Sequence, residues 1–180
     1  MFVTTSTLLH GDLTSSDGAD AASATADRAT RERVDEYAIL STERDAAFDR
    51  VVFTAAQMFR VPIAIVALQD GERLWFKAQV GLGITEVPST IAFCSAITHS
   101  SPLVVEDATT DPRFADNPLV TASPNIRFYA GAPLITPDGI RVGSLCVVDR
   151  SPKILLARQM WQLTQLAQSV VSILEQRRST

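Results

Sequence analysis

The sequence predicts an α+β domain in which helices pack on a central antiparallel sheet. Two pairs of strand-like segments are each joined by a tight turn, Asp70-Gly71 in the first pair and Pro137-Asp138-Gly139 in the second. Segments with helical spacing of apolar residues precede the first pair and follow the second. Because strands joined by short turns run antiparallel, this order predicts one antiparallel sheet covered by helices.

Composition and charge exclude several classes of protein. The 180 residues carry 16 basic and 20 acidic side chains, a net charge of −4, so we expect no nucleic-acid partner and no anionic membrane partner. The longest apolar run, residues 61–68, is far shorter than a membrane span. The first residues lack the basic and apolar regions of a secretory signal, which predicts a cytoplasmic location. Two cysteines are too few for a disulfide framework.

Residues 1–35 are predicted to be a flexible tail, and residues 36–180 a single domain. The tail is rich in Ser, Thr, Ala and Asp and has no repeating apolar face, so it buries too little surface to offset the entropy of ordering.

Within the domain, apolar periodicity and turn residues define the expected elements. A helix is predicted over 42–59, where Thr42 to Asp45 has the spacing of a capping box. The strand pairs are 63–68 with 74–79 and 127–134 with 141–148. Between them we expect a loop over 80–88, a short helix over 91–98 capped by Ser89, and a strand over 103–105. The connection 107–125 is long for a compact domain, which is typical of a functional loop.

The last helix is predicted to begin near Pro152 and carries a heptad pattern. Six apolar residues follow one another at steps of four and three: Leu156, Met160, Leu163, Ala167, Val170 and Leu174. We interpret this seam as a dimerisation surface for a second copy of the chain. The alternative is a helix that uses the same residues only to cover the sheet.

Three motifs in the second half of the domain resemble one known family. They are DATTDPRFADNPLV at 107–120, IRFYAGAPL at 126–134 and GSLCVVD at 143–149. Together with residues 61–64, 75–77 and 93–94, they make the chain similar to the GAF domain over about residues 42–178. The resemblance is greatest to bacterial GAF modules that precede histidine kinase or diguanylate cyclase domains.

The resemblance implies a six-stranded antiparallel sheet with the terminal helices on one face and a ligand pocket on the other, under residues 88–125. It also implies a small-molecule sensor in two-component or cyclic di-GMP signalling that dimerises through its terminal helices. The sequence ends at residue 180 with no room for an output domain. We therefore expect a kinase or cyclase partner that acts in trans, or a truncated chain.

The ligand pocket of such a domain is expected to combine an apolar wall with a few polar groups. The candidate residues are Phe93, Cys94, Asp107, Arg113, Phe114, Asn117, Arg127, Phe128 and Tyr129. Because a guanidinium group binds carboxylate or phosphate in bidentate fashion, the two arginines predict a polar or anionic metabolite. The alternative for the aspartates is local capping of turns and pairing with the arginines.

The cysteines and histidines predict neither a metal nor a cofactor. Cys94 lies near the start of the short helix, where it is either a thiol of lowered pKa or a small buried apolar residue. Cys146 lies inside a strand and is expected to be inert. Bilin-binding GAF relatives have His after the attachment cysteine, whereas Ser95 follows Cys94, which argues against a photoreceptor. No His or Cys cluster has metal-ligand spacing.

Three functional hypotheses follow. The preferred one is a non-catalytic sensor that binds a small molecule and acts as a homodimer, which a ligand screen would test. The second is a free-methionine sulfoxide reductase on the same fold, although only Cys94 is well placed for that chemistry. The third is a scaffold without a ligand that docks on a kinase or cyclase. Turnover of methionine sulfoxide and pull-down experiments distinguish these two from the first.

Overall fold

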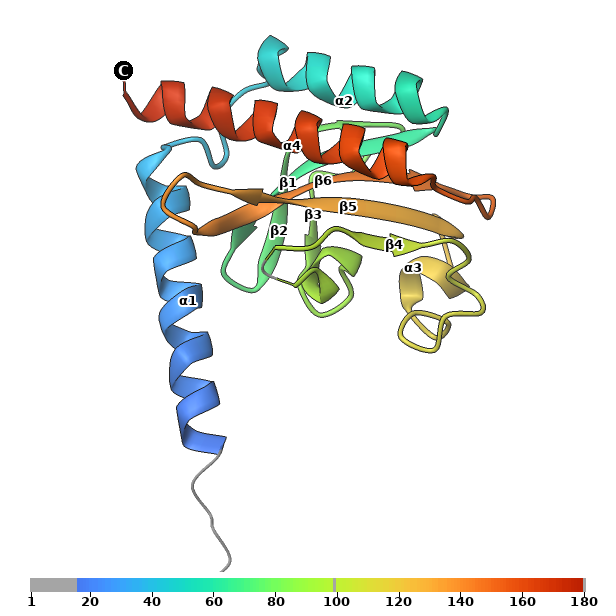
Figure 1. The fold of residues 1–180 in the computed structure, drawn as a ribbon, viewed down its shortest axis with the longest axis horizontal. Helices are drawn as coiled ribbons and strands as arrows, with labels where there is room; N and C mark the ends of the chain where they lie inside the picture. Colours follow the sequence, from blue (N-terminus) through green and yellow to red (C-terminus); the bar gives the residue numbers. More distant parts are fainter. Residues whose placement is uncertain (1–15, 99, 180) are drawn as a thin grey trace, which may run out of the picture.

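One antiparallel sheet of six strands organises the computed structural model, which describes residues 16–98 and 100–179. The strands are β1 (Ile63–Asp70), β2 (Arg73–Val80), β3 (Glu86–Pro88), β4 (Leu103–Val105), β5 (Phe128–Ile135) and β6 (Arg141–Asp149). Their order across the sheet is β3-β2-β1-β6-β5-β4, with every neighbouring pair antiparallel (Figure 1). The predicted fold class is confirmed.

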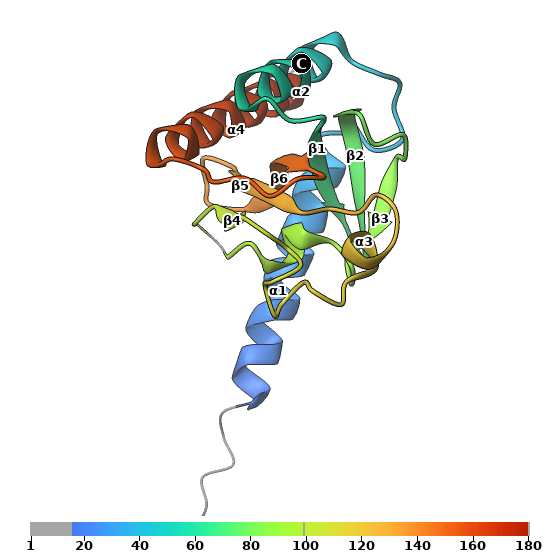
Figure 2. The ribbon, with the colours of Figure 1, turned by 90° about the vertical axis from the view of Figure 1, so that its right-hand side faces the viewer.

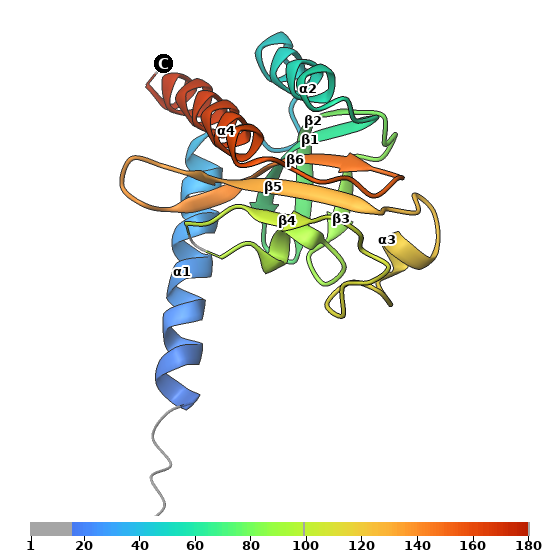
Figure 3. The ribbon, with the colours of Figure 1, turned by 45° about the vertical axis from the view of Figure 1, so that its right-hand side comes forward.

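The two faces of the sheet are covered by different kinds of structure. Helices α2 (Ala46–Phe59) and α4 (Ala157–Arg178) lie side by side on one face (Figure 3). The other face carries a layer of loops with the 3-10 helix η1 (Phe93–Ala96) and the short helix α3 (Pro118–Thr121). Side chains alternate between the two faces along each strand, so the sheet separates two apolar cores. We call the second side the loop face.

Several predicted boundaries differ from the observed ones. Helix α2 begins at Ala46, after Asp45, whose carboxylate accepts a hydrogen bond from the Ala47 amide at 2.9 Å, so the Thr42 capping box does not start it. Ser89 does not cap η1, which begins after Ala92 without a side-chain cap. Strand β3 lies in the predicted loop over 80–88. Its three residues contain one buried side chain, too few to show a period in the sequence.

Helix α1 (Ser16–Glu36) occupies most of the segment that the sequence predicts to be a flexible tail. The prediction is wrong for this helix, and residues 1–15 lie outside the described residues. Val34 is the one bulky apolar residue of α1, so the segment shows no repeating apolar face, although its six alanines favour a helix. Val34, near its end, is buried in the helix-side core, and Tyr37 is buried just after it. The first half of α1 extends away from the sheet (Figure 2).

Polar contacts attach the end of α1 to the β5–β6 turn and to the end of α4. Arg33 donates two hydrogen bonds to the Asp138 carboxylate, at 2.8 and 2.6 Å. The Tyr37 hydroxyl donates to Glu175 of α4 at 2.6 Å. The Arg33 guanidinium, first by its hydrogen bond, holds the pKa of Asp138 well below its usual range. We call Arg33, Tyr37, Asp138 and Glu175 the helix clasp.

Replacing Arg33 with Ala should release α1 from the body of the domain. The change removes a bidentate ion pair and leaves the Asp138 and Glu175 carboxylates close to one another without their cation. Amide exchange in α1 should rise by about tenfold or more, since few other contacts protect this helix. Hydrogen exchange read by mass spectrometry measures the change. The matched control is Arg28→Ala on the exposed face of α1, and equal exchange in both variants would contradict the clasp.

The predicted dimerisation seam on α4 is largely occupied within the monomer. Leu163, Ala167, Val170 and Leu174 are buried against the sheet. Met160 is half-buried, and Leu156 is 61% exposed. The heptad interpretation is therefore wrong for four of the six residues. Steps of four and three residues produce the same stripe on a helix that covers a sheet, so the pattern does not distinguish the two arrangements.

Candidate functional site

A small cavity lies on the loop face, between the sheet and the loop layer. Its volume is about 40 Å³, and its lining is almost wholly apolar. Ile65, Ala67 and Phe76 form its floor, and Phe93, Leu119 and Ile126 close it from the loop side. The floor residues come from the hairpin β1–β2, in which the first strand is buried on both faces, as the sequence predicts.

Two thiols and two hydroxyls form one cluster beside the cavity: Cys94, Cys146 and Tyr129 line it, and Ser144 lines the adjoining recess. The Sγ atoms of Cys94 and Cys146 are 3.3 Å apart. The Tyr129 hydroxyl donates to Cys94 Sγ at 3.1 Å and lies 3.0 Å from Cys146 Sγ. Ser144 Oγ is 3.2 Å from Cys146 Sγ. We call these four residues the thiol cluster.

Strand register explains why the thiol cluster forms. Cys146 of β6 lies directly opposite Gly131 of β5, and Tyr129 is on the same face of β5, two residues before Gly131. A Cβ atom at Gly131 would overlap the Tyr129 hydroxyl and the side chain of Ile97. The glycine therefore provides the space into which the Tyr129 ring reaches toward the two sulfur atoms.

The environment shifts the pKa values of the two thiols in opposite directions. A hydrogen bond from the Cys146 thiol, together with donors from Ser144 and Tyr129, stabilises the Cys94 thiolate and lowers the pKa of Cys94. Burial raises the pKa of Cys146, and the neighbouring Cys94 charge adds to this effect. Burial likewise raises the pKa of the Tyr129 hydroxyl, which therefore remains a donor. Of the two thiols, Cys94 is therefore the one whose ionised form is favoured.

Aromatic rings form the loop-side wall next to the thiol cluster. The rings of Phe93 and Phe114 are stacked, with centroids 4.2 Å apart and 6° between their planes. The centroids of the Phe93 and Tyr129 rings are 5.1 Å apart. Of the predicted residues, Phe93, Cys94 and Tyr129 line the cavity, whereas Phe114 stacks on Phe93 and does not line it. Phe128 is on the opposite face, buried in the helix-side core, because it is adjacent to Tyr129 in a strand with a period of two.

The charged and amide side chains predicted to bind a ligand do not line the cavity. Asp107 accepts hydrogen bonds from the amide and hydroxyl of Thr109, which lower its pKa. Arg113 is exposed and pairs with Asp111 in bidentate fashion, at 3.0 and 2.6 Å. These contacts are the local turn bonding that was the alternative interpretation of the sequence.

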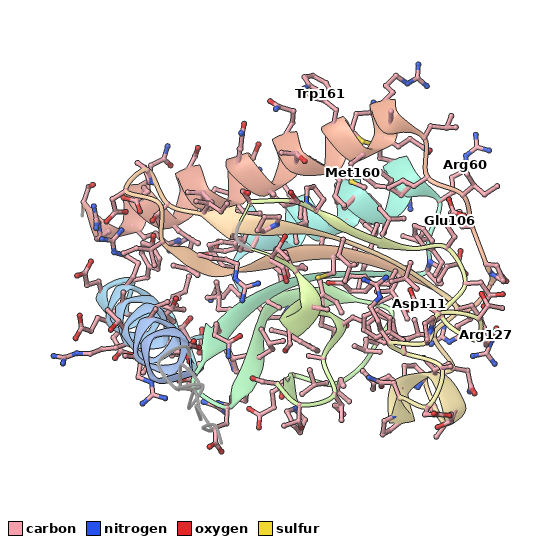
Figure 4. The ribbon with its side chains drawn as sticks, turned by 60° about the horizontal axis from the view of Figure 1, so that its bottom comes forward. Arg60, Glu106, Asp111, Arg127, Met160 and Trp161 are labelled. Carbon is pink, nitrogen blue, oxygen red and sulfur yellow. The ribbon has the colours of Figure 1, made fainter. Side chains whose placement is uncertain are left out.

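The other two predicted polar residues also stabilise the loop. Asn117 accepts from the Leu119 amide and donates to the Ile91 carbonyl at 2.8 Å, which joins α3 to the segment before η1. Arg127 donates to the carbonyls of Val120 and Ile126, each at 3.0 Å. Figure 4 shows Asp111 and Arg127 at one end of the sheet. The predicted pocket with convergent charges is therefore not observed among the described residues.

Cys146 and the floor of the cavity were missed by the sequence interpretation. Strand alternation gives a usable signal, because it places Cys146 on the same face as Ser144 and Val148 and away from Leu145. The sequence offers no signal for the 3.3 Å approach of Cys94, which comes from a different segment.

A second, larger space lies outside the cavity. This groove of about 630 Å³ runs between α1 and the first hairpin and is lined by charges of both signs, including Asp27, Arg31, Glu72 and Arg141. A small recess shared by Arg141 and Cys94 lies next to it. Arg141 donates to the Ile97 carbonyl at 2.6 Å, which ties the end of η1 to the start of β6.

The described residues contain neither a membrane-spanning helix nor a metal-binding cluster. No helix within residues 16–98 and 100–179 is long and apolar enough to cross a bilayer. The same residues contain no group of three or more His, Cys, Asp or Glu side chains that could hold a metal ion.

Comparison with known proteins decides the family. The family model described as the GAF domain matches residues 43–174, which is most of the chain. The chain belongs to the GAF domain family. Among curated proteins, it is 43% identical over 149 residues to "Cyclic di-GMP phosphodiesterase PA2567" of Pseudomonas aeruginosa. This alignment covers 82% of the chain but 25% of that relative, so the chain spans about a quarter of its length.

Solved structures share the fold at low sequence identity. The GAF domain of a phosphoenolpyruvate-protein phosphotransferase from Coxiella burnetii has a TM-score of 0.63 and 15% identity, covering 84% of this chain and 94% of that one. The free methionine-R-sulfoxide reductase of Neisseria meningitidis, solved with its substrate, has a TM-score of 0.61 and 19% identity, covering 85% and 92%. At this identity the likeness establishes the fold alone.

Proposed function

We propose that this GAF domain is a non-catalytic input module of a bacterial cyclic di-GMP signalling protein. The relative named as a cyclic di-GMP phosphodiesterase supports this context, and the alignment extends over only a quarter of that protein. The family match at residues 43–174 supports the assignment of this quarter to the GAF domain rather than to the hydrolytic part.

The observation that carries the proposal is the small apolar cavity on the loop face. A module that senses a small molecule needs a site whose occupation moves the structure around it. The cavity lies beside η1, a four-residue helix, and its apolar lining favours a small neutral molecule. The polar or anionic metabolite expected from the sequence has no support in the cavity, since the charged candidates have local partners.

A chain of contacts joins the cavity to both terminal helices. Cys94 is in η1, and the carbonyl of Ile97, which ends η1, accepts from Arg141. The Arg141 carbonyl accepts from Thr30 of α1 at 2.9 Å. The helix clasp then joins α1 to the end of α4. In this proposal, a displacement of η1 biases the position of α1 relative to α4, and that bias is the output signal.

We further propose a homodimer that uses the exposed apolar residues just before α4 and in its first turns. Ile154, Leu156 and Trp161 are between 61 and 71% exposed, an unusual concentration of large apolar side chains. Trp161 points away from the sheet on α4 (Figure 4), and Phe53 and Met58 are exposed on neighbouring α2. Aromatic residues of this kind dominate the binding energy of many protein interfaces.

If the chain dimerises, its average molecular mass in solution should rise with protein concentration, and this rise should depend on Trp161. Sedimentation equilibrium should show a monomer–dimer equilibrium for the chain. Trp161→Glu should weaken association by about tenfold or more, because it places a charge in an apolar contact. Gln168→Glu, at an exposed position on the same helix, is the matched control for charge. A monomer at all concentrations would contradict the dimer.

A titration with small neutral compounds tests the cavity as the input site. Binding should shift the amide resonances of η1 and β6, and anionic compounds of similar size should have no effect. Ala67→Val places two added methyl groups at the cavity floor and should reduce binding by about tenfold or more. Ala64→Val, on the helix face of the same strand, is a control for the effect of added volume. Binding that is unchanged in Ala67→Val would exclude the cavity.

A free-methionine sulfoxide reductase is the second candidate function, because two cysteines rather than one meet at the cavity. The 40 Å³ apolar cavity has neither the room nor the charged partners that a zwitterionic amino acid requires. We therefore expect no reduction of methionine sulfoxide above the rate of the Cys94→Ser variant. Turnover that depends on Cys94 would replace the sensor proposal with this enzyme.

A further inference from the structure

Two thiols of different character meet where a small molecule can reach them, and this arrangement has a chemical consequence beyond ligand binding. The Sγ atoms of Cys94 and Cys146 are 3.3 Å apart, and a disulfide bond is about 2.05 Å long, so the two sulfur atoms have to approach by roughly 1.3 Å. We propose that Cys94 and Cys146 form a reversible intrachain disulfide when a small hydroperoxide enters the cavity. This proposal does not depend on the proposed role in cyclic di-GMP signalling.

The two cysteines are held differently, so Cys94 is the one that moves. Cys146 is buried in β6, a strand with neighbours on both sides. Cys94 is half-buried on η1, a single 3-10 turn without a side-chain cap at its start. A single turn in a loop layer is displaced more easily than a strand that is hydrogen-bonded on both sides.

The reaction divides into two steps whose atoms balance. In the first, the Cys94 thiolate attacks one oxygen of the hydroperoxide, the O–O bond breaks, and hydroxide or alkoxide leaves and takes up a proton. Cys94 becomes a sulfenic acid, oxidised by two electrons, and the peroxide is reduced by two electrons. Tyr129 and Ser144 supply the hydrogen bonds that stabilise the attacking thiolate.

In the second step, Cys146 attacks the sulfur of the sulfenic acid. The S–S bond forms, the S–O bond breaks, and the departing hydroxide carries the Cys146 proton away as water. The sum is two thiols and one hydroperoxide giving one disulfide, one water and one further water or alcohol. A dithiol reductant reverses the modification by thiol–disulfide exchange.

The cavity selects the class of oxidant by size and charge. A buried water needs roughly 10 to 15 Å³, so a cavity of about 40 Å³ admits a molecule of a few heavy atoms. The apolar lining disfavours ions, whereas hydrogen peroxide is neutral and able to form hydrogen bonds with the thiol cluster. Cys94 also borders a small recess next to the open groove beside α1, and the two spaces share Gln69 and Arg141.

The test treats the reduced 180-residue chain with one equivalent of hydrogen peroxide after removal of the reductant. We expect both thiols to be lost together, with a peptide map that links Cys94 to Cys146 within one chain. An excess of dithiothreitol should restore both thiols. The unmodified chain gives this result without a variant, so misfolding of a variant does not affect it. Retention of both thiols, a link between two chains, or sulfinic acid at Cys94 without a link would each overturn the proposal.

Variants separate the two steps. Cys146→Ser should stop at the sulfenic acid, trapped by dimedone at Cys94, and Cys94→Ser should slow the oxidation of Cys146 by about tenfold or more. Ser95→Ala, on the same turn, should oxidise like the unmodified chain.

A parallel sample receives methionine sulfoxide instead of peroxide. If only the sulfoxide oxidises the pair, the peroxide proposal fails and the reductase is favoured. If no disulfide forms, the titration of the Ala67→Val variant still tests the sensor proposal.

Discussion

Replacing Leu163 with Ala is expected to lower the free energy of unfolding by about 2–5 kcal/mol. Leu163 is fully buried where α4 packs on the sheet, so its truncation removes apolar contacts and leaves a void in the helix-side core. Unfolding in urea, followed by circular dichroism, measures the loss as a lower midpoint with a similar slope.

Leu156→Ala is the matched control because the same residue type stands at the exposed beginning of the helix. Its effect on unfolding should stay within about 0.5 kcal/mol at concentrations where the chain is monomeric. Equal losses for Leu163→Ala and Leu156→Ala would contradict the packing of α4. Comparing the two variants therefore distinguishes a helix that packs its buried side chains on the sheet from one whose six heptad residues form a dimer interface.

The second large effect is expected in the reactivity of Cys94. The hydrogen bond from Cys146, assisted by Ser144 and Tyr129, lowers the pKa of the Cys94 thiol to about 6. The rate of alkylation by iodoacetamide should therefore reach half its maximum near pH 6, whereas an ordinary cysteine does so at about pH 8.5. At pH 7 the fraction of thiolate should exceed that of an ordinary cysteine by more than about tenfold.

The same shift gives stability a defined dependence on pH. Because the folded-state pKa of Cys94 lies below its unfolded value, the unfolded chain binds the proton more tightly in the range between them. The stabilisation is present above the unfolded pKa and is lost as the pH falls toward about 6. Cys146→Ala removes the largest cause and should move the alkylation midpoint upward, and Tyr129→Phe should move it upward less. A midpoint of about 8.5 in the unmodified chain would contradict this environment of Cys94.

Local patterns in the sequence predicted the sheet well. The Asp70-Gly71 turn and the alternation that follows it gave the first hairpin to within a few residues, because turn type and strand period are local properties. Helix α1 and the short strand β3 were not predictable in this way. Helix α1 is attached by contacts such as the Arg33–Asp138 pair, whose members are more than a hundred residues apart in the chain.

In the candidate site too, part of the arrangement was predictable from the sequence and part was not. The aromatic residues Phe93, Phe114 and Tyr129 meet as expected from their motifs. Arg113 and Arg127 were expected to face a ligand because their chemistry permits it, yet each finds a partner within its own loop. Strand alternation could have assigned Cys146 to the loop face, but the approach of Cys94 depends on the path of the chain through η1.

The central claim is that a change on the loop face alters the terminal helices. Hydrogen exchange of the 180-residue chain in its dithiol and disulfide forms tests this claim most directly. We expect the Cys94–Cys146 link to change exchange in η1, in the β5–β6 turn and in both helices of the clasp, along the contacts through Arg141 and Arg33. Changes confined to the residues beside the two cysteines, with α1 and the end of α4 unaltered, would contradict it.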